Sequence, residues 1–191
     1  MSERAAFVDR DGTINVKAAE GEYVTSPEEF VFLPGAERAI RLLAHAGWRV
    51  IVVSNQRGVA LGRMTAADLD AVNGRMAHLP IDGVFVCPHE RGQCDCRKPG
   101  TGLFRQAQER FPAIEFERSV MIGDADSDIE AGRAIGARTF RVGEPPLPSL
   151  LDVAEQLASQ PTASPSRMRH ALTNWSQTTP GRRGQLLPQR R

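Results

Sequence analysis

The sequence predicts an α/β protein built on a parallel sheet with helices on both of its faces. Short apolar runs, each long enough for one buried strand, alternate along the chain with longer segments whose apolar residues recur at helical spacing. A length of 191 residues suits one domain with a sizeable core. The hydrophobic fraction of 41% and the net charge of +1 are those of an ordinary globular protein, and they indicate no general attraction to nucleic acid or to a membrane.

Five apolar runs are expected to form the strands. The first, AAFV, stops abruptly at Asp9, and the second begins at Trp48 and contains the β-branched run VIVV. The later runs are similarly short, and several of them end in a polar or acidic residue. The expected strands comprise residues 5–8, 48–54, 81–87, 119–124 and 138–142.

Five segments between and after these runs are expected to be helical. The segment that begins PGAERAIRLL places Ala36, Ile40 and Leu43 on one face, and Gly47 is a stop signal. Thr65 is expected to cap the second helix. The expected helices lie within residues 34–47, 65–79, 102–111, 127–137 and 148–159.

Polar side chains follow four of the expected strands. In a parallel sheet the carboxyl ends of the strands lie at one edge, where ligands bind. Asp9, Ser54, Cys87 and Asp124 all fall at such ends. The sequence therefore predicts that these four residues converge on one rim of the sheet.

Two carboxylates, Asp9 and Asp11, stand two residues apart in the run VDRDGT, where Gly12 allows a tight turn. A carboxylate can attack phosphorus and form an acyl phosphate when nearby cations screen its repulsion from the phosphate. The second carboxylate can move protons. This pair predicts phosphoryl chemistry at a site that also supplies positive charge.

Residues that could supply this positive charge occur further along the chain. Asp124 can complete an oxygen-ligand set with Asp9 for Mg²⁺, which would carry one positive charge centre. Lys98 is a second positive centre. Lysine is scarce, because only Lys17 and Lys98 accompany the many arginines. The hydroxyl of Ser54 and backbone N–H groups near Asn55 can donate to phosphate oxygens.

The order of these motifs resembles the haloacid dehalogenase superfamily of phosphohydrolases. The resemblance is carried by DRDGT, VVSN, Lys98 and GDADSD, and it covers residues 5 to about 158. It implies a Rossmann-like sheet with a minimal cap, which consists of a flap loop over residues 12–34 and a loop that carries the cysteines.

The same resemblance implies roles for the acidic residues. Asp9 would be the nucleophile, and Asp11 would be the general acid that protonates the leaving group and then activates water against a phosphoaspartate. Mg²⁺ would be bound by Asp9, the backbone carbonyl of Asp11 and Asp124. Asp128 would orient Lys98 or a metal-bound water.

All three cysteines of the chain lie within ten residues, together with one histidine. The spacing Cys-x-His-x4-Cys-x-Cys suits tetrahedral Zn²⁺ with no open position, and therefore a structural metal. Such a clip would order a polar loop and set the direction in which Arg97 and Lys98 leave it. The predicted zinc ligands are Cys87, His89, Cys94 and Cys96.

The run CPH…CDCRKP resembles the zinc-bearing subfamily that contains the D-glycero-D-manno-heptose 1,7-bisphosphate 7-phosphatases and the histidinol-phosphate phosphatases. The stretches SNQRGVALGRMT, KPGTGLF and GEYV are more similar to the heptose enzymes. This resemblance implies Mg²⁺-dependent removal of the C7 phosphate in heptose precursor and lipopolysaccharide biosynthesis. Arg57, Arg97 and Lys17 are candidates for holding the phosphate that is not cleaved.

Three alternative functions stay open at this point. The same chemistry could act on histidinol phosphate. A nucleic-acid 3′-phosphatase would use the arginine-rich end of the chain, although nucleic acid is the less favoured partner. A non-catalytic zinc module would bind a partner through its cysteine loop and release no phosphate.

The domain organisation predicted from composition is a phosphatase domain over residues 1–158 and a tail over residues 159–191. The tail is rich in Pro, Ser and Gln, contains six Arg and no acidic residue, and is expected to be disordered. We found no signal peptide or membrane-spanning run, and an odd number of cysteines argues against a disulfide framework. We therefore expect a cytoplasmic monomer whose partner is a small phosphorylated metabolite and which has no membrane contact.

Overall fold

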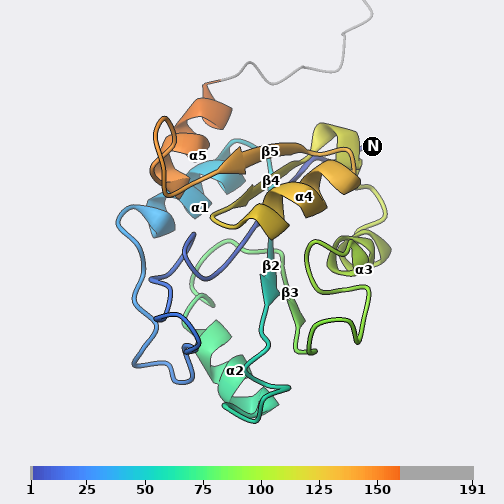
Figure 1. Cartoon of the computed structure of the whole chain (residues 1–191). Coiled ribbons are helices and arrows are strands. Elements are labelled where there is room, and N and C mark those ends of the chain that lie inside the picture. The colour runs from blue at the N-terminus through green and yellow to red at the C-terminus, as the bar shows by residue number, and fades with distance from the viewer. Residues whose placement is uncertain (1, 160–191) are drawn as a thin grey trace, which may run out of the picture. The chain divides into compact units, whose positions relative to one another are not determined.

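The computed structural model describes residues 2–159, and the predicted disordered tail therefore lies outside the described residues apart from Ser159. Five parallel strands form one sheet in the order β3-β2-β1-β4-β5 (Figure 1). This arrangement confirms the predicted α/β class. The strands are β1 (Ala5–Val8), β2 (Arg49–Asn55), β3 (Gly83–Cys87), β4 (Val120–Gly123) and β5 (Arg138–Arg141).

Five α-helices follow the strands as the sequence pattern predicts. They are α1 (Ala36–His45), α2 (Ala66–Gly74), α3 (Gly102–Arg110), α4 (Asp126–Ala134) and α5 (Leu150–Ala158). Two details differ from expectation. Helix α2 ends at Gly74, because glycine disfavours helix and the following residues form turns that bury Met76 and Leu79. A short 3-10 helix, Phe116–Arg118, was not predicted.

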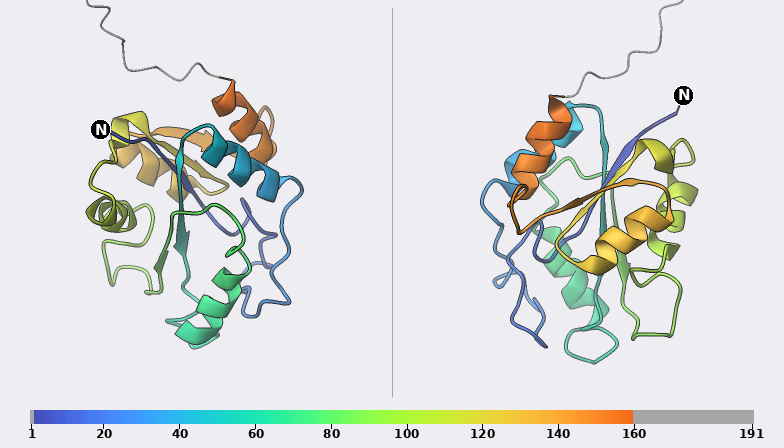
Figure 2. Two further views of the ribbon diagram at one scale, coloured as in Figure 1. Left: turned by 180° about the vertical axis from the view of Figure 1, so that it is seen from behind. Right: turned by 45° about the horizontal axis from the view of Figure 1, so that its top comes forward.

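The sheet is covered on both faces, as the strand pattern predicts. Helices α1 and α5 pack side by side on one face, and α3 and α4 cover the other (Figure 2). In β1 the side chains alternate between these two cores, with Val8 in the first and Phe7 in the second. Both cores consist of buried apolar side chains, which position the ends of the strands.

The loops that follow β1, β2 and β3 extend beyond the carboxyl edge of the sheet (Figure 1). Residues 12–34 contain no helix or regular strand and form the expected flap, which an isolated bridge between Asn15 and Phe32 closes at its base. Within residues 2–159, no helix is long and apolar enough to cross a membrane.

Candidate active site at the carboxyl edge of the sheet

A buried ion-pair centre joins three motifs that are distant in sequence. Lys98 Nζ lies 2.6 Å from Asp9 Oδ1 and 2.7 Å from Asp128 Oδ1, and it donates to the carbonyl oxygen of Val53 at 2.6 Å. The Lys98 side chain is 1% exposed. Three oxygens thus use all three protons of the ammonium, which fixes its position beside Asp9.

Burial changes the acid–base properties of this centre. Burial raises the pKa of Asp9 to about 7, an effect that Lys98 opposes and Asp128 reinforces. Burial alone would lower the pKa of Lys98, but the charges of Asp9 and Asp128 raise it above its ordinary value. Lys98 therefore stays charged at neutral pH, and a further cation beside Asp9 would favour the ionised, nucleophilic carboxylate.

Asp124, at the end of β4, has the features of a metal ligand. Its Oδ1 atom is buried and has no hydrogen-bond partner among the described residues, and its Oδ2 atom accepts a hydrogen bond from Lys17 at 2.8 Å. One carboxylate oxygen from each of Asp9, Asp124 and Asp128 lies within 4.8 Å of the other two. Oxygen ligands of this kind suit Mg²⁺, so the site could hold that cation.

Gly12 lets the turn after β1 approach this cluster. Its φ is +89°, a conformation that other residues adopt only with strain, and a Cβ atom there would lie 2.5 Å from Asp124 Oδ2. The run Asp-x-Asp-Gly therefore brings the backbone of the first motif against the carboxylate of the last.

Asp11 is held by residues that the sequence analysis did not single out. Gln56 Nε2 donates to Asp11 Oδ2 at 2.7 Å, Asn15 Nδ2 donates to Oδ1 at 2.9 Å, and Arg10 pairs with Oδ2 at 3.0 Å. Arg10 is fully buried and also donates to Asn73 of α2 at 2.9 Å. The position of Arg10 between two aspartates was the one sequence feature that could have indicated its contact with Asp11. Its partner in α2, Asn73, is 63 residues away and had no such indication.

The two polar residues at the end of β2 have different surroundings. Ser54 is buried and accepts a hydrogen bond from Gln56 Nε2 at 2.8 Å. The Asn55 side chain binds the main chain of Lys98 twice, donating to its carbonyl at 3.1 Å and accepting from its N–H at 2.9 Å. The side chain of Asn55 therefore holds the main chain of Lys98 in place.

A cavity of about 700 Å³ opens over this centre. It is lined by both aspartates of the first motif, by the flap and by three guanidinium groups, those of Arg57, Arg91 and Arg97. Arg97 Nη1 is buried without a hydrogen-bond partner among the described residues. Arg57 Nε instead lies 2.6 Å from Glu90, which raises the pKa of Arg57 and neutralises part of its charge.

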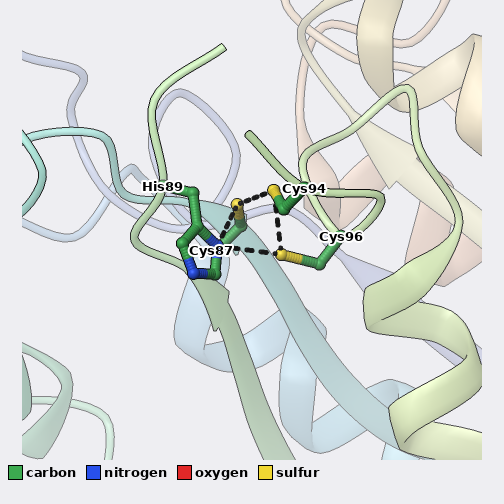
Figure 3. A group of neighbouring side chains, drawn as sticks. All are labelled: Cys87, His89, Cys94 and Cys96. Atoms are coloured by element: carbon green, nitrogen blue, oxygen red, sulfur yellow. Dashed lines mark hydrogen bonds between the residues drawn. The ribbon is translucent and has the colours of Figure 1, made fainter. Parts of the chain in front are cut away.

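The four predicted zinc ligands meet next to the cavity, and their ligand atoms point toward one another (Figure 3). Cys94 Sγ lies 3.5 Å from Cys87 Sγ and 3.3 Å from Cys96 Sγ, and His89 Nδ1 lies 3.3 Å from Cys96 Sγ. A tetrahedral zinc with Zn–S bonds of about 2.3 Å has ligand edges of roughly 3.8 Å. The cluster is close to that size, and its cysteines form no disulfide.

The thiols of this cluster need a cation to ionise together. Burial raises the pKa of Cys87 and of Cys96, whereas for Cys94 burial is outweighed by hydrogen bonds from Cys96 and other neighbours, which lower its pKa to about 7. A bound divalent cation would favour the thiolate form of all three. These residues could therefore hold a metal.

Comparison with known proteins agrees with this geometry. A family model described as "HAD-hyrolase-like" matches residues 95–144. A D-glycero-alpha-D-manno-heptose-1,7-bisphosphate 7-phosphatase of Mycobacterium bovis is 39% identical over 149 residues, which cover 72% of this chain and 78% of the relative. A D-glycero-beta-D-manno-heptose-1,7-bisphosphate 7-phosphatase of Escherichia coli O6:H1 is 34% identical over 188 residues, which cover 87% of this chain and 97% of the relative.

Among solved structures, the D,D-heptose 1,7-bisphosphate phosphatase from B. bronchiseptica, complexed with magnesium and phosphate, matches with a TM-score of 0.72 and 31% identity. The match covers 81% of this chain and 97% of that chain. The fold, the acidic centre and these similarities define a phosphohydrolase. The chain belongs to the haloacid dehalogenase-like phosphatases, and it is a phosphoric monoester hydrolase.

Proposed function

We propose that this protein removes the C7 phosphate of D-glycero-D-manno-heptose 1,7-bisphosphate. The observation that carries the proposal is that several cations line one cavity. Lys98 pairs with Asp9, where a phosphate would react, and Arg91 and Arg97 of the cysteine loop line the same cavity. A bisphosphate could place one anion at Lys98 and the other at these guanidinium groups, which bind phosphate well.

The chemistry follows from the positions of the two aspartates. Asp9 attacks phosphorus, the bond to the sugar O7 breaks, and Asp11 donates its proton to that oxygen. Asp11 then takes a proton from water as the water attacks the phosphoaspartate, which releases phosphate and restores Asp9. Asp128 and Asn55 keep Lys98 beside Asp9, and the contacts from Gln56 and Arg10 orient Asp11.

Mg²⁺ is the proposed catalytic cofactor, held by Asp9, Asp124 and the backbone carbonyl of Asp11. When bound it supplies positive charge to the phosphate oxygens and lowers the repulsion between phosphate and carboxylate. The unpartnered Oδ1 atom of Asp124 supports this assignment. The resemblance of this chain to a phosphatase complexed with magnesium and phosphate supports it independently.

Histidinol phosphate is the second candidate substrate, and one observation favours it. Glu20 and Glu22 of the flap also line the cavity, and their carboxylates could bind an ammonium group. The same carboxylates can accept hydrogen bonds from sugar hydroxyls, however, and an ammonium would lie near the guanidinium groups of Arg91 and Arg97. We therefore favour the bisphosphate, and its anomer is open because the relatives carry both alpha and beta names.

A substrate comparison tests this assignment. We expect kcat/KM for heptose 1,7-bisphosphate to exceed that for histidinol phosphate by about 100-fold, measured as phosphate release with Mg²⁺. Arg97→Met should raise KM for the bisphosphate by roughly tenfold because it removes a contact to the distal phosphate. The same variant should leave KM for heptose 7-phosphate almost unchanged. A preference for histidinol phosphate would disprove the heptose assignment.

Zn²⁺ is the proposed structural metal of the cysteine loop. We expect about one zinc per chain by elemental analysis, and a Cys96→Ser variant should lose most of it. Because the loop leads directly into Arg97 and Lys98, this variant should also unfold at a lower temperature and lose at least tenfold in kcat/KM. Parent protein that contains no zinc and is fully active would contradict this role.

The remaining predictions concern partners and location. A small phosphorylated metabolite as substrate, a monomeric state and a cytoplasmic location are part of the proposal. The nucleic-acid 3′-phosphatase alternative depends on a tail that lies outside the described residues. A non-catalytic zinc module does not account for the ion-pair centre of Asp9, Lys98 and Asp128.

A further inference from the structure

Lys17 of the flap holds one oxygen of the proposed metal ligand Asp124. Its Nζ atom lies 2.8 Å from Asp124 Oδ2, and its side chain is 58% exposed. The other oxygen, Oδ1, is buried without a hydrogen-bond partner in the described part of the chain. One oxygen of Asp124, Oδ2, thus accepts a hydrogen bond from the flap, and the other, Oδ1, has no hydrogen-bond donor among the described residues.

The two lysines of the chain pair with different aspartates of the acidic cluster. They are the only lysines among 24 cationic Lys and Arg residues. Lys98 pairs with Asp9 and Asp128, and Lys17 pairs with Asp124. Lysine differs from arginine in presenting a compact charge on a flexible stem, which suits a group that changes partner.

The two ion pairs differ in how firmly they are held. The Lys98 side chain is 1% exposed, whereas Lys17 is largely in solvent and lies on an irregular loop. An exposed ion pair contributes little to stability, so Lys17 can leave Asp124 at small cost. Lys17 also lines the cavity above Asp9, and its ammonium therefore lies within the space that a bound phosphate would share.

We propose that Lys17 is a catalytic residue that neutralises Asp124 before the metal binds and then moves to the transferring phosphate. The ammonium of Lys17 would be repelled by a divalent cation bound at Asp124 and would lose that carboxylate as its partner. The released ammonium can then donate hydrogen bonds to phosphate oxygens on the flap side, opposite Lys98. This inference rests on the proposed Mg²⁺-dependent phosphatase function and adds a residue of the flap to it.

The test uses three variants of the whole chain. Lys17→Met removes the charge, Lys17→Arg keeps it, and Arg91→Met removes an exposed cation of the same cavity for which no contact with Asp124 is seen. Mg²⁺ binding is measured by titration calorimetry without substrate, and the binding of inorganic phosphate at saturating Mg²⁺ is then measured by the same method. Thermal unfolding checks that each variant is folded.

We expect Lys17→Met to bind Mg²⁺ about two- to fivefold more tightly than the parent, because a competing cation is removed. The same variant should bind phosphate roughly tenfold more weakly. Arg91→Met should change Mg²⁺ affinity much less, and Lys17→Arg should resemble the parent. A lysine that only pairs with Asp124 would also tighten metal binding when it is removed, but its removal would leave the affinity for phosphate unchanged.

Unchanged or weaker Mg²⁺ binding by Lys17→Met would overturn the competition with the metal. An unchanged affinity for phosphate would overturn the move to the phosphate. Neither measurement uses the heptose substrate, so both results stand if that substrate assignment fails. Absence of any Mg²⁺ binding by the parent would instead count against the proposed cofactor itself.

Discussion

Asp9→Asn is expected to abolish phosphate release, with kcat falling on the order of 10⁴-fold or more. The amide that replaces the carboxylate is not a nucleophile, and no phosphoaspartate can form on it. The measurement is phosphate release in single-turnover and steady-state experiments with Mg²⁺ present. Turnover by the variant at the rate of the parent would contradict the role of Asp9 and with it the proposed mechanism.

Stability measurements separate this loss of chemistry from misfolding. Burial raises the pKa of Asp9 from its ordinary 3.8 to about 7, so the folded protein keeps a proton that the unfolded chain releases. The stabilisation from this group is complete below pH 3.8 and is lost as pH rises through 7. In metal-free buffer we therefore expect the melting temperature of Asp9→Asn, relative to the parent, to rise between pH 5 and pH 8. A relative decrease would contradict the raised pKa.

Lys98→Met should be the most destabilising change at the site. It removes a buried cation that contacts three oxygens, and it leaves Asp9 and Asp128 as unpaired neighbouring carboxylates. Breaking a buried pair in this way costs about 3–5 kcal/mol, and the loss of a charge aimed at the phosphate should lower kcat by about 10³-fold. Denaturant unfolding and phosphate release in parallel measure the two effects.

Lys17→Met is the matched control for this prediction, since it removes the same type of side chain from an exposed position of the same cluster. It should cost less than about 1 kcal/mol of stability. The destabilisation by Lys98→Met should also shrink as pH falls below 7, because burial raises the pKa of Asp9 to about 7 and protonation of Asp9 relieves the repulsion. Equal stability of the two variants at pH 8 would show that Lys98 does not hold the centre together.

The secondary structure could be predicted from the sequence because each element carries its own local signal. The run AAFV and the β-branched run of β2 are too short and too apolar to be anything other than buried strands. Thr65 caps α2 as expected, and its side chain accepts a hydrogen bond from the Asp68 N–H. The early end of α2 was not predicted because the buried residues Val72, Met76 and Leu79 keep helical spacing across Gly74, although the helix ends at that glycine.

The principal site residues were also visible in the sequence. Asp9 and Asp124 follow parallel strands, and parallel strands bring their carboxyl ends to one edge whatever the loops do. The four residues of the cysteine loop are so close in sequence that their spacing alone predicts a tetrahedral cluster. Both inferences could be made without knowing the distance between side chains that are far apart in the sequence.

The supporting contacts of the site had no such signal. The side chain of Asn55 binds the main chain of Lys98, which is 43 residues away. The buried contact between Arg10 and Asn73 and the pairing of Lys17 with Asp124 likewise join loops and helices that no local pattern relates. Each of these contacts depends on how the flap, α2 and the cysteine loop pack over the edge of the sheet.

The sequence by itself determined the order of strands and helices, the edge of the sheet at which the candidate site lies and the residues proposed for its chemistry. Periodicity and spacing are local properties, and the geometry of parallel sheets converts them into a common site. Only the tertiary structure decided which cation serves which carboxylate. That choice depends on burial and on distances of a few ångströms between segments far apart in the chain, because ion pairs are strong only when desolvated and in contact.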